Sequence, residues 1–229
     1  MIPTLNTSRN SKANTAIKLS LAFWFTLVFV LSLNDQFARS PTAPPLPILC
    51  GVAIPILLFV AAYRTSAIFR AAIFSADLRL LTAIQAWRAG GMAFLALYAH
   101  GILPALFAFP AGIGDIAIGV SAPWIALKLT NQPDYANTRH FAVWNILGIA
   151  DLVIAVSAGA LSSGFVPVLA GNVTTSAMAN LPLVLIPAFL VPMLVMLHVA
   201  ALVQARNVTA SKSKRSSSEV PLIAAMPRI

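Results

Sequence analysis

The sequence contains six long apolar stretches separated by polar residues or prolines, and these constrain its fold more than any other feature. An α-helix of about 20 residues crosses the roughly 30 Å hydrocarbon core of a bilayer. Apolar residues make up 59% of the chain and charged residues 9%, whereas soluble proteins average about 45–50% and about 25%. We therefore predict an all-α integral membrane protein, a bundle of about six transmembrane helices with the lipid bilayer as its partner. The spans are expected at residues 16–33, 48–63, 81–103, 105–128, 140–161 and 181–204.

The chain divides into a transmembrane domain and two tails. Residues 1–15 are expected to be a polar cytoplasmic tail, residues 16–205 the six-helix domain, and residues 206–229 a basic, disordered cytoplasmic tail. The first span has a basic flank like a signal peptide, but its length and the lack of a cleavage motif favour an uncleaved helix. Residues 64–79 alternate basic and apolar positions, so they form either an interfacial helix or an extension of the third span. The sixth span is expected to be bent or broken by three prolines, Pro182, Pro187 and Pro192.

The positions of the basic residues predict the orientation. The net charge is +9, but the 15 Lys and Arg residues are scattered between apolar stretches, which argues against nucleic acid as a partner. With six spans, every Lys and Arg except Arg39 falls on one side of the membrane. Cytoplasmic segments carry the excess of Lys and Arg. Both termini are therefore expected in the cytoplasm, and the expected location is a bacterial inner (plasma) membrane.

A repeated Gly-Ile-x-Asp motif places one aspartate in each of two neighbouring spans. Residues 112–122 read GIGDIAIGVSA and residues 148–158 read GIADLVIAVSA, with seven of eleven positions identical. A charged residue at the centre of a membrane costs roughly 2.5–3.5 kcal/mol on insertion scales, so two of them ask for an explanation. Consecutive spans run antiparallel, and the spacing predicts that Asp115 and Asp151 both lie roughly 15 Å deep, near the midplane. Small residues share the face of each aspartate, which predicts a close crossing of the two helices.

These two carboxylates define the candidate site. We expect Asp115 and Asp151 to bind a proton, a cation or a small polar solute, or else to act as structural hydrogen-bonding groups between helices. Arg88 either extends to the cytoplasmic interface or forms a bidentate bond with a buried carboxylate, for which Asp151 is the nearer candidate. Asn145 and Gln85 are expected to complete this network. If Arg88 reaches Asp151 alone, Asp115 is the group that exchanges a proton.

Two classes of function remain open from the sequence. The first is a small transporter or channel-like protein, expected as a homodimer because 229 residues are few for a transporter. The second is a membrane-embedded enzyme or redox protein in which His140 and His198 hold a haem at the cytoplasmic side; a structural or assembly subunit is a further alternative. Enzymatic activity is left undecided. No metal and no cofactor other than this alternative haem is predicted, since Cys50 is the only cysteine and catalytic motifs of soluble enzymes are absent.

Overall fold

Helices make up all the regular structure of the described chain. The structure is a computed structural model that describes the backbone of residues 4–40, 43–169 and 171–223, and side chains from residue 15 to residue 207 within those ranges. No strand forms among these residues, which confirms the all-α class. The α-helices are α1 (Thr4–Leu33), α2 (Leu46–Thr65), α3 (Ala67–Ser75), α4 (Leu78–Ile84), α5 (Met92–Ala99), α6 (Ala105–Asn131), α7 (Arg139–Leu161) and α8 (Val191–Ile223). The shorter 3-10 helices are η1 (Gln85–Gly91), η2 (Pro133–Asn137) and η3 (Thr175–Ala179), and η4 (Ile186–Leu190) is a π-helical turn.

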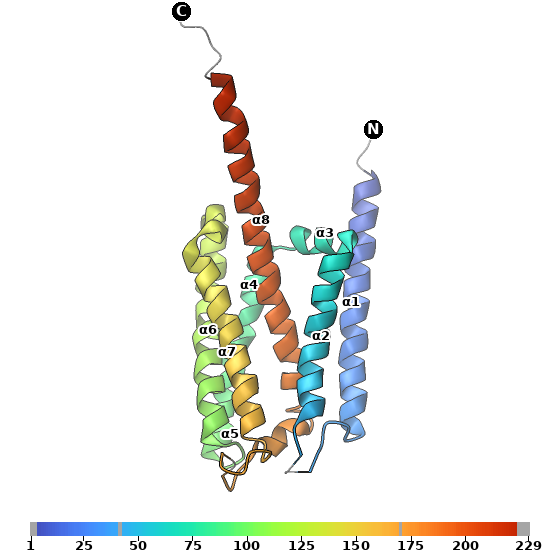
Figure 1. Cartoon of the computed structure of the whole chain (residues 1–229), viewed down its shortest axis with the longest axis vertical. Coiled ribbons are helices and arrows are strands. Elements are labelled where there is room, and N and C mark those ends of the chain that lie inside the picture. Colours follow the sequence, from blue (N-terminus) through green and yellow to red (C-terminus); the bar gives the residue numbers. More distant parts are fainter. Residues whose placement is uncertain (1–3, 41–42, 170, 224–229) are drawn as a thin grey trace, which may run out of the picture.

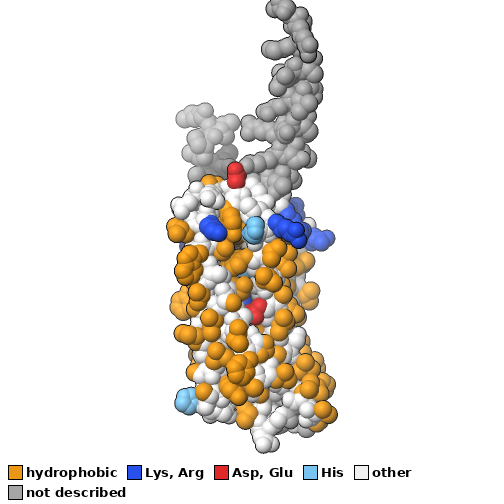
Figure 2. All heavy atoms as spheres, turned by 90° about the vertical axis from the view of Figure 1, so that its left-hand side faces the viewer, with side chains coloured by type: hydrophobic (Ala, Val, Ile, Leu, Met, Phe, Trp, Pro, Cys, Tyr) orange, Lys and Arg blue, Asp and Glu red, His pale blue; other side chains and the backbone are white. Residues whose placement is uncertain are grey.

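Six helical segments of the described chain are long and apolar enough to cross a membrane, as the sequence predicts. They lie side by side in one bundle, and both ends of the chain lie at the same end of it (Figure 1). Apolar side chains cover most of the face in Figure 2, and Lys and Arg gather near the end that carries the termini. The six segments are Thr15–Leu33, Leu46–Thr65, Leu78–Ala99, Ala105–Asn131, Arg139–Leu161 and Ile186–Asn207.

The first and last helices extend beyond the expected spans. α1 begins at Thr4 and α8 continues to Ile223, so helix occupies segments that the sequence analysis assigns to a polar tail and a disordered tail. A helix that a span has already nucleated gains one hydrogen bond for each residue added. Neither Gly nor Pro interrupts residues 4–14 or 206–220. The outermost parts of the two expected tails, 1–3 and 224–229, lie outside the described residues.

Residues 64–79 include a separate short helix, so of the two alternatives the interfacial helix fits the structure. α3 lies across the end of the bundle that carries the termini (Figure 1). Ser66 separates it from α2 and caps it, since its side-chain oxygen accepts a hydrogen bond from the Phe69 amide at 3.2 Å. Asp77 begins α4 in the same way by accepting from the Arg79 amide at 2.9 Å. Hydrogen bonds from the side chain and then the backbone of Arg79 lower the pKa of Asp77.

Two of the candidate spans change their winding. The third span passes from α4 through the 3-10 helix η1 into α5. A 3-10 helix has three residues per turn, so side chains three positions apart align; Gln85, Arg88 and Gly91 are the buried residues of η1. The sixth span begins at the π-helical turn η4, which contains Pro187, and only then continues as α8. Because proline has no amide hydrogen to donate, this turn is the local break that the prolines predict.

Candidate functional site

A single arginine joins the two repeated aspartates. Arg88 on η1 donates from Nε to Asp115 Oδ1 on α6 at 2.7 Å, and from Nη2 to Asp151 Oδ2 on α7. The arginine side chain is 1% exposed and each aspartate side chain 15% exposed. Arg88 therefore does not extend to the interface, and that alternative is wrong. Asp151 is a partner of Arg88 as expected, but Arg88 does not reach it alone, because Asp115 binds the same guanidinium. The condition under which the sequence assigns proton exchange to Asp115 is therefore not met.

The remaining terminal nitrogen of Arg88 is held by α7 and α8. Its Nη1 donates to the Gly148 carbonyl oxygen at 3.1 Å and lies 3.2 Å from His198 Nε2. Because a guanidinium only donates, His198 Nε2 must accept, which assigns the ring proton to Nδ1. That nitrogen lies 2.9 Å from Asn145 Oδ1, and Asn145 Nδ2 donates to the Phe141 carbonyl oxygen at 2.9 Å. This chain of hydrogen bonds fixes a neutral His198 behind the arginine.

Of the two amides expected to complete the network, only Asn145 joins it. Gln85 lies in the same buried row of η1 as Arg88, but its Nε2 donates to the Leu194 carbonyl oxygen at 3.2 Å. Its Oε1 has no hydrogen-bond partner within the part of the chain that the structure describes. Gln85 thus lies beside the ion pairs without bonding to them.

The two histidines of the haem alternative have different surroundings. His198 is 1% exposed, and both of its ring nitrogens lie within hydrogen-bonding distance of protein groups. His140 is exposed at the start of α7. Since His198 has no free nitrogen to ligate iron, the pair does not fit a haem. No group of three or more His, Cys, Asp or Glu residues suited to a metal ion occurs among the described residues.

Glycines allow the helices that carry the aspartates to meet. A Cβ atom on Gly114 would overlap the carboxylate of Asp151, and one on Gly148 would overlap the His198 ring. The repeat therefore supplies both acids and, through Gly114, the space for Asp151, whereas the glycine packed against Asp115 is Gly91 of η1. The buried residues of α6 include the small residues that the helical spacing predicts for this face, namely Ala108, Ala111, Gly112, Gly119 and Ala122.

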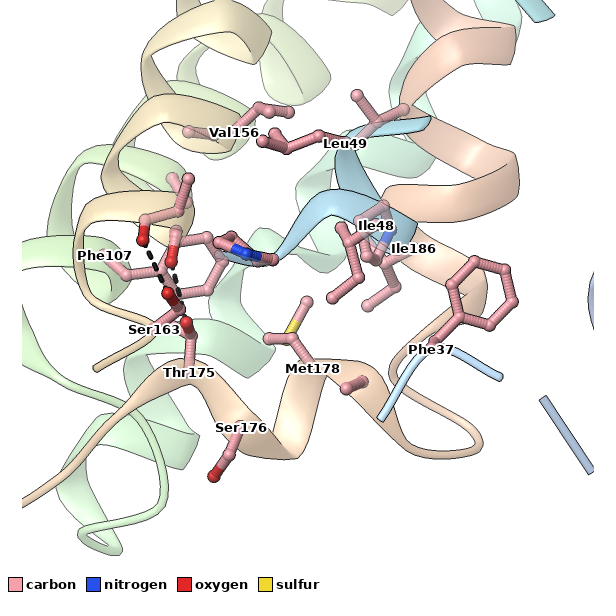
Figure 3. Close-up of a pocket in the computed structure, with 18 of the residues that line it drawn as sticks. Phe37, Ile48, Leu49, Phe107, Val156, Ser163, Thr175, Ser176, Met178 and Ile186 are labelled. Carbon is pink, nitrogen blue, oxygen red and sulfur yellow. Dashed lines mark hydrogen bonds between the residues drawn. The ribbon is translucent and has the colours of Figure 1, made fainter. Parts of the chain in front are cut away.

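Asp115 also lines a cavity of about 180 Å³. Residues of the loops before α2 and after α7 line the same cavity as Asp115. Several of these residues are drawn in Figure 3, and the loops lie at the end of the bundle opposite the termini (Figure 1). Among the described residues that line it, the charged ones are Asp115 and the exposed Arg39. Asp151 does not line it. The two repeated aspartates therefore differ, because Asp115 faces the cavity whereas Asp151 lies against the backbone of α6.

Sequence reasoning missed the contact between Trp144 and His198. The two rings are edge-to-face with their centroids 5.4 Å apart, and Trp144 Nε1 donates to Ser121 Oγ at 2.8 Å. It also missed the Gly148 carbonyl group as an acceptor for Arg88. Helical spacing could have indicated that Trp144 and Gly148 belong to the site, because positions 144, 148 and 151 follow at intervals of four and three residues on one face of α7.

The fold and the site together define a class of protein: a helical bundle with six candidate membrane spans, in which a buried arginine pairs with one aspartate from each copy of an internal repeat. The chain belongs to the family described as Domain of unknown function (DUF8737), whose model matches residues 45–206. The match includes every residue of the Arg88 network and begins after α1. Comparisons with curated proteins and with solved structures give no match.

Proposed function

We propose that the chain is a multi-pass protein of a bacterial inner membrane that transports a proton, another cation or a small polar solute through the site at Arg88. Six apolar helices support insertion into a bilayer. The Lys and Arg residues near the end that carries the termini support a cytoplasmic location for both termini (Figure 2). The interrupted third and sixth spans are also a feature of transporters, whose binding sites are built on broken helices.

One observation carries the proposal: a single guanidinium lies between two carboxylates, and one of the carboxylates lines a cavity. With both acids ionised, the three side chains sum to +1 − 2 = −1. An uncompensated charge away from water is costly, so a proton or another cation should bind where it can reach the cluster. Asp115 is the aspartate that a solute in the cavity can reach, and we assign it the exchange. Asp151 and His198 hold Arg88 from the other side.

The test is flux across liposomes that contain the purified protein, measured between about pH 5 and pH 8 with a pH-sensitive dye inside. Asp115→Asn keeps a side-chain oxygen that can accept from Arg88 Nε but cannot carry a proton or a negative charge. We expect this variant to fold and to lose pH-dependent flux.

The matched control is Asp35→Asn, which makes the same chemical change at an exposed position that does not line the cavity. It should retain the flux of the unmodified protein. If Asp115→Asn transports as well as Asp35→Asn does, Asp115 is not the exchanging group, and its bond to Arg88 serves to hold the helices together.

A further inference from the structure

We propose that the cavity lined by Asp115 binds a small organic cation with an apolar body, with the ammonium group bound to Asp115 and the body between apolar walls. The inference rests on the proposed function, because it names the solute that the same site would accept. Three features of the cavity support it: the carboxylate of Asp115 in its lining, the chemistry of its walls and its size.

The inner end of the cavity offers an acceptor with negative charge. Arg88 Nε donates a hydrogen bond to Asp115 Oδ1, whereas Asp115 Oδ2 accepts no hydrogen bond from any described residue. The same guanidinium is also paired with Asp151, so its single positive charge neutralises only one of the two carboxylates when both are ionised. A primary ammonium has three donors and a positive charge. It can therefore satisfy the free oxygen and neutralise the cluster at the same time.

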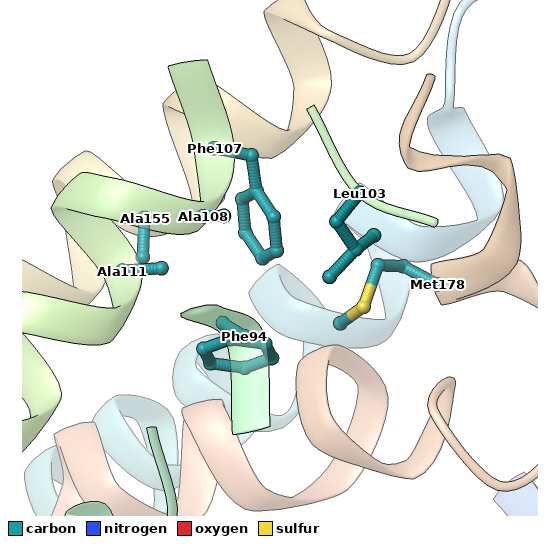
Figure 4. Close-up of a cluster of buried hydrophobic side chains, with 7 residues drawn as sticks. All are labelled: Phe94, Leu103, Phe107, Ala108, Ala111, Ala155 and Met178. Atoms are coloured by element: carbon teal, nitrogen blue, oxygen red, sulfur yellow. The ribbon is translucent and has the colours of Figure 1, made fainter. Parts of the chain in front are cut away.

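The walls favour an apolar body. Phe94, Phe107 and Met178 belong to one buried apolar cluster and also line the cavity (Figure 4). The hydroxyl groups of Ser163 and Thr175 donate to backbone carbonyl oxygens at 2.8 and 2.7 Å, so they offer no free donor to a solute (Figure 3). These walls disfavour an anion or a fully polar solute, because burying polar groups without partners costs free energy.

Polar groups lie mainly at the outer end of the cavity. Arg39, Ser176 and Asn180 line it there and are exposed. A solute that enters from this end thus passes from a polar entrance to apolar walls and then to a carboxylate. This order matches a molecule whose charged group is small and whose remaining surface is apolar.

The size selects a molecule with about one ring. The cavity holds about 180 Å³, and a dry cavity of about 150 Å³ accepts benzene. The rings of Phe94 and Phe107 are edge-to-face with centroids 5.2 Å apart, and aromatic faces also attract cations. A metal ion that loses its hydration water would need several oxygen ligands from the protein, whereas Asp115 is the sole carboxylate among the described lining residues. An organic cation is therefore favoured over a metal ion.

Three probes of similar shape and different charge test this proposal on the unmodified protein. Benzylamine is a cation near neutral pH, benzyl alcohol is neutral and benzoate is an anion. Each is titrated against the purified full chain in detergent, with the thermal unfolding temperature Tm as the readout. Benzylamine should raise Tm with a saturable dependence on concentration, and the other two probes should not. Equal shifts with benzylamine and benzyl alcohol would overturn the proposal.

Variants assign any binding to Asp115. Asp115→Asn should weaken the binding of benzylamine about tenfold or more, the expected cost of losing a hydrogen bond to a charged group. Asp35→Asn should leave it unchanged. If benzylamine has no effect while proton flux still depends on Asp115, the organic-cation proposal fails and the proposed function stands. If benzylamine binds through Asp115 but no solute crosses the membrane, the binding site stands and the transport function fails.

Discussion

Removing the guanidinium of Arg88 should destabilise the protein strongly. Loss of one partner from a buried ion pair costs about 3–5 kcal/mol, so Arg88→Ala should lower the free energy of unfolding by about that amount. Arg88→Lys keeps the positive charge but replaces the planar guanidinium, which donates in several directions, by a single ammonium group. An unsatisfied buried acceptor costs about 1–3 kcal/mol, which is the loss expected for the lysine variant. Four acceptors lose a hydrogen bond from Arg88 in the alanine variant: the carboxylates of Asp115 and Asp151, the Gly148 carbonyl oxygen and His198 Nε2.

The measurement is reversible unfolding in mixed detergent micelles, followed by circular dichroism. The matched control is Arg79→Ala, since the Arg79 side chain lies in the same span but is 55% exposed and pairs with an exposed Asp77. That change should cost at most about 1 kcal/mol. Adding Asp115→Asn or Asp151→Asn to Arg88→Ala should recover part of the loss, because one unpaired carboxylate disappears. Additive losses in both double-mutant cycles, or an Arg88→Ala variant as stable as Arg79→Ala, would refute the argument that Arg88 holds both aspartates.

Two further predictions test the packing and the orientation. A Cβ atom on Gly119 would lie 2.7 and 2.9 Å from backbone carbons of η1, whereas one on Gly90 would meet no atom within 4 Å. Gly119→Ala should therefore lower the free energy of unfolding by about 1–3 kcal/mol, and Gly90→Ala should leave it unchanged. Equal effects of the two substitutions would contradict the close approach of α6 to η1. In a background without cysteine, the variants Ser40→Cys and Thr174→Cys should react with an impermeant thiol reagent added outside intact cells, and Asn137→Cys should not. The reason is that residues 40 and 174 lie at the end of the bundle opposite the termini. Labelling at position 137 would overturn the proposed orientation.

The sequence was sufficient to predict the helical class, the number of candidate spans and the two aspartates, because each leaves a direct mark on composition. An apolar stretch of about 20 residues has few other uses, and an isolated acid within such a stretch is conspicuous. The break in the sixth span followed from Pro187 for the same reason, since proline removes a hydrogen bond wherever it stands in a helix. The function of these residues stays a proposal.

The connections within the site could not be read from the sequence. A sequence pattern would extend an ideal α-helix through residues 78–99, which would place Arg88 at a different angle about the helix axis. In the structure the 3-10 helix η1 carries Arg88, and its guanidinium bonds both Asp115 and Asp151. From the sequence His198 is a candidate haem ligand, because a lone histidine in an apolar stretch does not reveal its partners. In the structure it accepts from Arg88 while Asn145 holds its other nitrogen. Such contacts depend on how three spans pack, which no local pattern encodes.

The winding of η1 also sets the length of the third span. A 3-10 helix rises about 2.0 Å per residue and an α-helix about 1.5 Å, with about 120° and 100° of rotation. If the seven residues of η1 rewound as α-helix, the span would shorten by about 3.5 Å and α5 would rotate against α4 by about 140°. Translation and rotation of this segment are therefore coupled, as in a screw. Because Arg88 lies within η1, its bonds to Asp115 and Asp151 restrain the pitch of the helix as well as the position of a charge.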